Sequence, residues 1–131
     1  MHRNPSRPLS PHLSIWRWVP HMLVSILHRV TGSGLSTVGA LALVWWLVAA
    51  ASGPEAYDVF LSWAKTWIGL VVAIGLSWAF FQHMLSGLRH LVMDIGAGFE
   101  IRTNKFWAWM TIVGSVTLTA LLWLTIAMDR L

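Results

Sequence analysis

The chain has 131 residues, of which 56% are hydrophobic and only 11% are charged, and its mean hydropathy is +0.64. Soluble globular domains carry about 25% charged residues, so this composition excludes an ordinary soluble domain and predicts an integral membrane protein in contact with lipid. The absence of cysteine excludes a disulfide framework, an iron–sulfur cluster held by this chain and thiol catalysis. The net charge of +4 comes from basic residues at the ends of apolar stretches, which argues against nucleic acid as a partner.

Three apolar stretches without Asp, Glu, Lys or Arg follow one another along the chain, at residues 30–51, 67–88 and 106–128. A helix of about 20 apolar residues crosses a hydrocarbon core of about 30 Å, so each stretch is long enough to span a membrane. None of them alternates with the period of two that barrel strands require. The predicted fold class is therefore all-α, with three transmembrane helices.

The links between these stretches set the expected boundaries. Ser52-Gly53-Pro54-Glu55 predicts a turn that ends the first helix and starts a short interfacial one, and residues 94–105 join the second helix to the third. Short links favour an up-down-up bundle that forms a single domain over residues 1–131. Within it we expect an N-terminal segment and three spans, at residues 1–20 and at about 22–51, 60–92 and 104–128.

Lysine and arginine are distributed unequally between the two sides of this bundle. Seven of the nine lie in the N-terminal segment, at the start of the first span or around the second link: Arg3, Arg7, Arg17, Arg29, Arg89, Arg102 and Lys105. Only Lys65 and Arg130 lie on the opposite side. The positive-inside rule then predicts a cytoplasmic N-terminus in a bacterial inner membrane, with the mitochondrial inner membrane as the less favoured location.

A histidine lies inside the second apolar stretch. His83 precedes Arg89 by six residues, about 9 Å deeper along a helix if Arg89 marks the interface, and an ionisable group there needs a partner or a cavity. Gly87 and His90 share its helical face. The spacing is equally compatible with an axial ligand of a b-type haem, whose flat ring can approach Gly87, and with a histidine that hydrogen-bonds to a neighbouring helix. A six-coordinate haem would need its second ligand from a partner chain, because this chain has only one deep histidine.

Ser25 and Arg29 lie one turn apart at the cytoplasmic end of the first span, beside His28. A hydroxyl and a guanidinium at the membrane edge can hold a quinone head or a haem propionate. In the simpler interpretation, Arg29 reaches a lipid phosphate and Ser25 bonds to the backbone. No catalytic residue is predicted, because the sequence lacks the common hydrolase and phosphate-binding motifs and its acids all lie at span ends.

Three stretches carry a resemblance to a known family: Arg7-Pro8-Leu9-Ser10-Pro11-His12-Leu13, Ser25-Ile26-Leu27-His28-Arg29-Val30-Thr31-Gly32 and His83-Met84-Leu85-Ser86-Gly87-Leu88-Arg89-His90-Leu91-Val92-Met93-Asp94. They resemble the large cytochrome b membrane-anchor subunit of succinate dehydrogenase (succinate:quinone oxidoreductase, respiratory complex II). With three spans in matching order, the resemblance covers nearly the whole chain. Trp16 and Met93 replace a tyrosine and a tryptophan that are common in this branch, and neither position is expected to carry electron transfer.

The resemblance implies a role for several residues. His83 matches the axial ligand of the haem iron, and the other ligand is then a histidine of the small anchor subunit. Ser25, Ile26 and Arg29 match the ubiquinone pocket near the iron–sulfur subunit. His28, Arg29 and His90 match the haem propionate side, where Asp94 also belongs to the motif.

The function implied by the resemblance is electron transfer by a membrane-anchor domain. This domain would dock the iron–sulfur and flavoprotein subunits and help to bind haem b and ubiquinone, which is the substrate of the complex. Succinate would be oxidised on another chain, so the protein is an enzyme only as a subunit. The alternatives are a fumarate reductase anchor and a haem-free membrane scaffold or transporter bundle.

Overall fold

The computed structural model describes residues 4, 6, 8 and 17–129, and the regular structure in this part of the chain is entirely helical. The elements in chain order are α1 (Pro20–Gly34), a single π-helical turn η1 (Leu35–Gly39), α2 (Ala40–Ser52), α3 (Pro54–Ala64), α4 (Trp67–Asp94) and α5 (Ile101–Met128). Arg3, Arg7, His12, Trp16, Arg130 and most of the stretch 7–13 lie outside the described residues. The predicted all-α class is confirmed.

Three helices are long and apolar enough to cross a membrane: Pro20–Ser52, Trp67–Asp94 and Ile101–Met128. The first combines α1, η1 and α2 into one helix of 33 residues. The expected span 22–51 lies within this helix and the expected span 104–128 lies within α5; both stay predictions. The chain therefore has the helices of an integral membrane protein.

The start of the second long helix differs from the expected 60–92, because residue 60 falls inside α3. The helix is interrupted at Lys65 and begins again at Trp67, after Thr66 in an extended conformation. The Thr66 hydroxyl accepts a hydrogen bond of 3.1 Å from the backbone N–H of Gly69, which caps the new helix. This local cap separates α3 from α4, and α4 begins where the second apolar stretch begins, at Trp67.

The turn predicted after Ser52 is present. Gly53 has φ 106°, a left-handed conformation that ends α2 and that glycine adopts without a side-chain clash. Pro54 then occupies the first turn of α3, where its missing N–H is harmless. The short helix α3 packs back on α2, with the rings of Trp45 and Phe60 edge to face at 5.1 Å.

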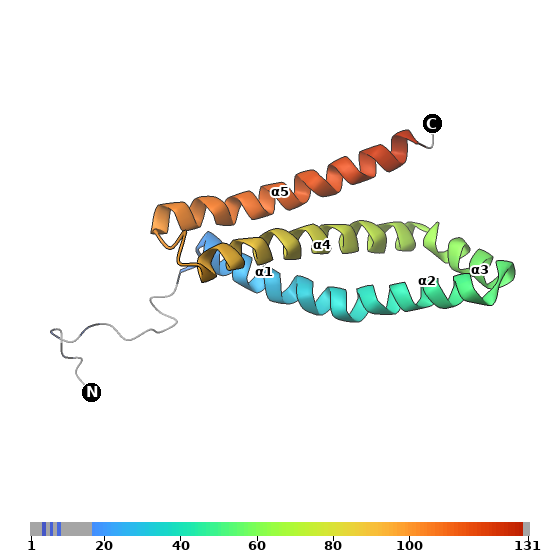
Figure 1. Ribbon diagram of the computed structural model, residues 1–131, viewed down its shortest axis with the longest axis horizontal. Helices are drawn as coiled ribbons and strands as arrows, with labels where there is room; N and C mark the ends of the chain where they lie inside the picture. The colour runs from blue at the N-terminus through green and yellow to red at the C-terminus, as the bar shows by residue number, and fades with distance from the viewer. Residues whose placement is uncertain (1–3, 5, 7, 9–16, 130–131) are drawn as a thin grey trace.

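The helix α4 lies between its neighbours and contacts both α1 and α5. Figure 1 shows α4 running back beside α1 and α2, with α5 along its other side. The link from α4 to α5 turns sharply at Gly96 and Gly98, which have φ 85° and 79°. The interfaces of α4 with α5 and with α1 are the most extensive in the described chain, and α1 also contacts α5.

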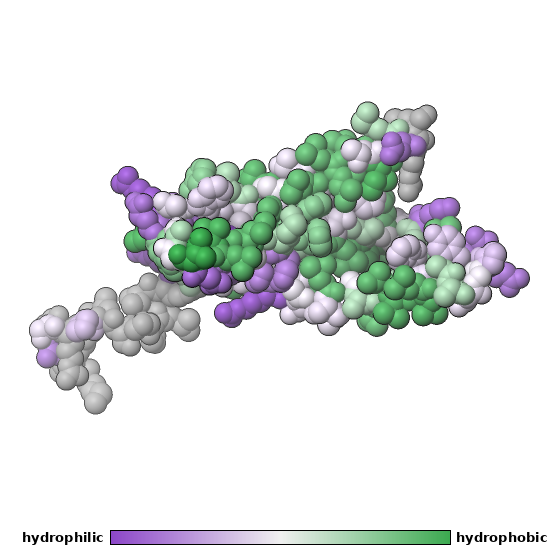
Figure 2. All heavy atoms as spheres, in the orientation of Figure 1, coloured by the Kyte–Doolittle hydropathy of each residue, from purple (hydrophilic) through white to green (hydrophobic). Residues whose placement is uncertain are grey.

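The interior of the described chain is more polar than the outer surface. The buried residues of the described chain are the apolar Val24, Ala49 and Ala108 and the polar Thr31, Gln82, Ser86, Thr111, Ser115 and Thr119. Figure 2 shows hydrophobic residues along the outside of the helices and hydrophilic ones mainly towards their ends. Lipid-embedded helices associate through small and polar residues rather than through the hydrophobic effect, so this distribution fits a bilayer.

Candidate functional site

The packing of α1 against α4 brings His83 onto the backbone of α1. A Cβ added at Gly32 would lie 2.8 Å from Cε1 of His83, closer than such atoms can approach. Thr31 turns its hydroxyl back onto its own helix and donates a hydrogen bond of 2.7 Å to the carbonyl of Leu27. Gly32 therefore makes the space in which the imidazole of His83 lies.

One ring nitrogen of His83 is held by α1 and the other is not. Nδ1 lies 3.1 Å from the carbonyl oxygen of His28 and 3.4 Å from the hydroxyl oxygen of Thr31. No hydrogen bond joins Nε2 to any described residue. A half-buried imidazole with one anchored nitrogen can present the other nitrogen to a ligand.

His28 extends the site on the α1 side. Its ring stacks on that of His83, with centroids 4.0 Å apart and planes within 7°, and its Nδ1 lies 2.7 Å from the hydroxyl of Ser86 on α4. The ring of His90 is 5.3 Å from that of His28, tilted by 59°. The predicted residues His28, His83 and His90 thus form one cluster, although they come from two helices.

The sequence predicted Gly87 as the glycine that makes room beside His83, but in the structure Gly32 has this role. Gly87 faces the ring of His28, whose Cε1 would be 3.6 Å from an added Cβ, an ordinary contact. The tight approach to His83 is at Gly32. Sequence spacing could not find Gly32, because it shares no helix with His83.

The other predicted residues of α1 flank His28 in the sequence: Ser25 and Ile26 precede it and Arg29 follows it. Ser25 is half-buried, while Ile26 is 41% exposed and Arg29 is exposed. Arg29 follows His28 directly, so it adjoins the histidine cluster, and Ser25 lies one turn earlier. Asp94 is the exposed last residue of α4.

A second polar contact, which sequence reasoning missed, joins α4 to α5. The hydroxyl of Ser115 donates a hydrogen bond of 2.8 Å to Oε1 of Gln82, and both residues are fully buried. Nε2 of Gln82 has no hydrogen-bond partner in the part of the chain that the structure describes. The available signal was a glutamine in an apolar span opposite Thr111, Ser115 and Thr119, which recur at helical spacing.

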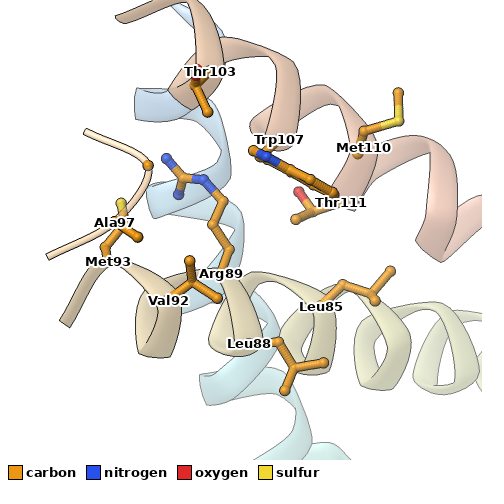
Figure 3. A pocket seen from close by; sticks show the side chains of 11 residues that line it. Leu85, Leu88, Arg89, Val92, Met93, Ala97, Thr103, Trp107, Met110 and Thr111 are labelled. Carbon is orange, nitrogen blue, oxygen red and sulfur yellow. The ribbon is translucent and has the colours of Figure 1, made fainter. Parts of the chain in front are cut away.

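A cavity of about 440 Å³ lies between the ends of α4 and α5 and the link that joins them. Its walls are mostly apolar, and the side chain of Arg89 extends into it (Figure 3). Nη2 of Arg89 donates a hydrogen bond of 2.8 Å to Oδ1 of Asn104. The histidine cluster does not line this cavity, so the two features are separate.

Together these features define a small membrane protein in which one helix presents an anchored imidazole at its contact with another. Among the described residues, no three His, Cys, Asp or Glu side chains are grouped as a metal site. The chain belongs to the family of succinate dehydrogenase/fumarate reductase transmembrane subunits, whose model matches residues 3–122. It is thus a membrane subunit of an oxidoreductase complex, as the motifs predicted.

Named relatives agree with this family. The chain is 40% identical over 116 residues to the succinate dehydrogenase cytochrome b556 subunit of Paracoccus denitrificans, covering 88% of each chain. It is 41% identical over 118 residues to the corresponding subunit of Rickettsia conorii, covering 89% of this chain and 90% of that one. The mitochondrial cytochrome b560 subunit of Mus musculus is 32% identical over 121 residues, with 88% and 67% covered. All three names favour succinate dehydrogenase over the fumarate reductase alternative.

Proposed function

We infer that this chain is the membrane anchor of a succinate dehydrogenase and supplies one axial ligand to a haem b. The observation that carries this proposal is the imidazole of His83, which is anchored through Nδ1 and has no partner at Nε2 among the described residues. The residues present fit the group, because imidazole is a common axial ligand of haem and a ligating histidine usually bonds its other nitrogen to a carbonyl. The names of the relatives, which are cytochrome b subunits, point the same way.

Haem b, when bound, takes up and gives back one electron at a time. His83 supplies one ligand nitrogen, and a histidine of the small anchor subunit supplies the other. His28 stacks on His83 and His90 lies beside His28; together with Arg29, which follows His28 in the sequence, they would pair with the haem propionates. The chain's own residues thus bind and orient the group, while succinate is oxidised on the flavoprotein subunit.

The quinone site that we propose lies on α1 at Ser25, Ile26 and Arg29, which flank His28 in the sequence. Ser25 and Arg29 share one face of the helix, where the hydroxyl and the guanidinium donate hydrogen bonds to a carbonyl of ubiquinone. Ile26 is exposed and offers an apolar contact for the ring or tail. The iron–sulfur subunit docks at this end, so that electrons reach the quinone over a short path.

The proposed topology follows from the charges. Arg29, Arg89, Arg102 and Lys105 lie at the end of the bundle where α1 begins and α4 meets α5, while Glu55 and Asp58 lie on α3 at the opposite end (Figure 1). The positive-inside rule then places the N-terminus in the cytoplasm and makes residues 1–131 one up-down-up anchor domain of a bacterial inner membrane.

The proposal is tested on the purified complex. We expect a reduced b-type absorbance spectrum in the wild type and its loss in His83→Ala, while the three spans stay inserted because the substitution makes α4 more apolar. His21→Ala serves as the matched control, since His21 lies on α1 outside the histidine cluster. A wild-type complex without a b-type spectrum would favour a haem-free scaffold, and an unchanged His83→Ala spectrum would remove His83 as the ligand.

A further inference from the structure

Two oxygen atoms of α1 approach Nδ1 of His83, and neither can donate a proton to it. The carbonyl oxygen of His28 only accepts hydrogen bonds. The single hydroxyl proton of Thr31 is directed to the carbonyl of Leu27 at 2.7 Å, so towards His83 the Thr31 oxygen also acts as an acceptor. Nδ1 of His83 must therefore carry the proton in both contacts, at 3.1 and 3.4 Å.

The protonation of one nitrogen determines the role of the other. A neutral imidazole has one N–H and one lone pair, so in His83 the lone pair is on Nε2. Gly32 allows the edge formed by Nδ1 and Cε1 to lie against α1, and Nε2 is the ring nitrogen farther from Gly32, with no described partner. The packing of α1 and α4 thus selects a tautomer before any ligand arrives.

The direction of the hydrogen bond between His28 and Ser86 follows in the same way from the second bond of the hydroxyl. The hydroxyl of Ser86 donates to the carbonyl of Gln82 at 2.6 Å, so it accepts from Nδ1 of His28 at 2.7 Å. A side chain of α4 therefore holds the ring of His28 in its stack on His83, while the backbone of α1 holds His83. Each helix orients the histidine of the other.

We propose that Thr31 is a positioning residue that, together with the carbonyl of His28, fixes His83 as an Nε2 ligand and lowers the reduction potential of the haem. This inference rests on the proposed function. Hydrogen-bond acceptors on the far N–H of a ligating histidine raise the basicity of the ligand nitrogen. A more basic ligand stabilises the ferric over the ferrous state.

The test compares Thr31→Val with Thr31→Ser in the complete complex. Valine keeps the shape of the 2% exposed side chain but lacks the hydroxyl, whereas serine keeps the hydroxyl. We expect Thr31→Val to retain haem and to shift the reduction equilibrium about two- to tenfold towards the ferrous form, a rise of roughly 20–60 mV for one electron. Thr31→Ser should titrate like the wild type, and haem content and absorbance-monitored redox titration are the readouts.

Each outcome decides the question. Loss of haem in Thr31→Val but not in Thr31→Ser would also support the role of the hydroxyl. An unchanged potential in Thr31→Val, or equal changes in the two variants, would overturn the inference by showing that only packing matters at this position. If the Thr31 variants keep their haem in that case, the proposed function is unaffected. A wild-type complex without haem would overturn both the proposed function and the inference about Thr31.

Discussion

Gln82 and His83 are neighbours in the sequence but face different helices. Consecutive residues of an α-helix are rotated by about 100°, so Gln82 points to Ser115 on α5 while His83 points to His28 and Thr31 on α1. The position of the imidazole therefore depends on both interfaces of α4. A substitution at the α5 interface can change the haem environment without touching the histidine cluster.

Ser25 and Arg29 are expected to act on quinone reduction rather than on succinate oxidation. In the proposed complex, a water-soluble dye would take electrons from the extramembrane subunits, whereas ubiquinone would have to bring its head to the proposed site on α1. A hydrogen bond from a charged donor contributes about 1.5–3 kcal/mol, against about 1 for a neutral one. Arg29→Leu should therefore reduce quinone turnover by about ten- to a hundredfold, and Ser25→Ala by less.

The measurement compares quinone-coupled and dye-coupled succinate oxidation in the same preparation. Ser33→Ala is a suitable control, because Ser33 is an exposed serine of the same helix, two turns from Ser25. Haem content is measured alongside, since Arg29 adjoins the histidine cluster. Equal loss of both activities in a haem-replete complex would place Ser25 and Arg29 outside the quinone site.

At the scale of the elements, α1 contains a pair of glycines that differ only in their surroundings. A Cβ at Gly32 would lie 2.8 Å from His83, whereas a Cβ at Gly34 would meet no atom within 4 Å. Because both glycines lie in α1, alanine gives the same gain in helix propensity at either position. We expect Gly32→Ala to displace the imidazole and lower the haem-to-protein ratio, while Gly34→Ala retains it. Equal haem content in the two variants would contradict the close approach of α1 and α4.

The contact of α4 with α5 includes a fully buried hydrogen bond. Ser115→Ala removes the donor to Gln82 and leaves the amide oxygen of a fully buried side chain unpaired. Interhelical hydrogen bonds in membranes contribute about 0.6 kcal/mol on average and up to about 1.7. We therefore expect a lower thermal midpoint for the complex in detergent, equivalent to a loss of about 0.5–2 kcal/mol.

Thr117→Val provides the control for this measurement. Thr117 is exposed and its hydroxyl bonds only to Val113 of its own helix. Its replacement should leave the midpoint within error of the wild type. A similar decrease in both variants would assign the effect to α5 itself rather than to its contact with α4.

The elements differ in how far the sequence could predict them. The long helices follow from local length and hydropathy, and the turn at Gly53-Pro54 follows from residues that directly form it. The break at Lys65-Thr66 was missed because the expected span was extended to residue 60, beyond Lys65, although Thr66 is a good N-cap residue. The stack of His28 on His83 and the tight contact at Gly32 depend on how two helices pack, which no local pattern encodes.

At the scale of the whole molecule, the proposed topology places α3 and the α4–α5 link on opposite sides of the membrane. Because the chain has no cysteine, single cysteines can be introduced without background. Asp58 and Lys105 are exposed and suit this purpose. We expect a membrane-impermeant thiol reagent to label Asp58→Cys from the periplasmic side and Lys105→Cys only from the cytoplasmic side. Labelling of both from one side would refute the three-span arrangement.

The polar interior of the chain also determines the order in which its structure is made and lost. Water that enters between α4 and α5 can replace the bond of Ser115 to Gln82, because the side chains gain equivalent bonds to water. The backbone bonds within each helix have no comparable substitute in a bilayer. The helices therefore separate from one another before they unwind, and biosynthesis follows the reverse order: each helix forms on insertion, and the histidine cluster exists only after lateral association of α1 with α4.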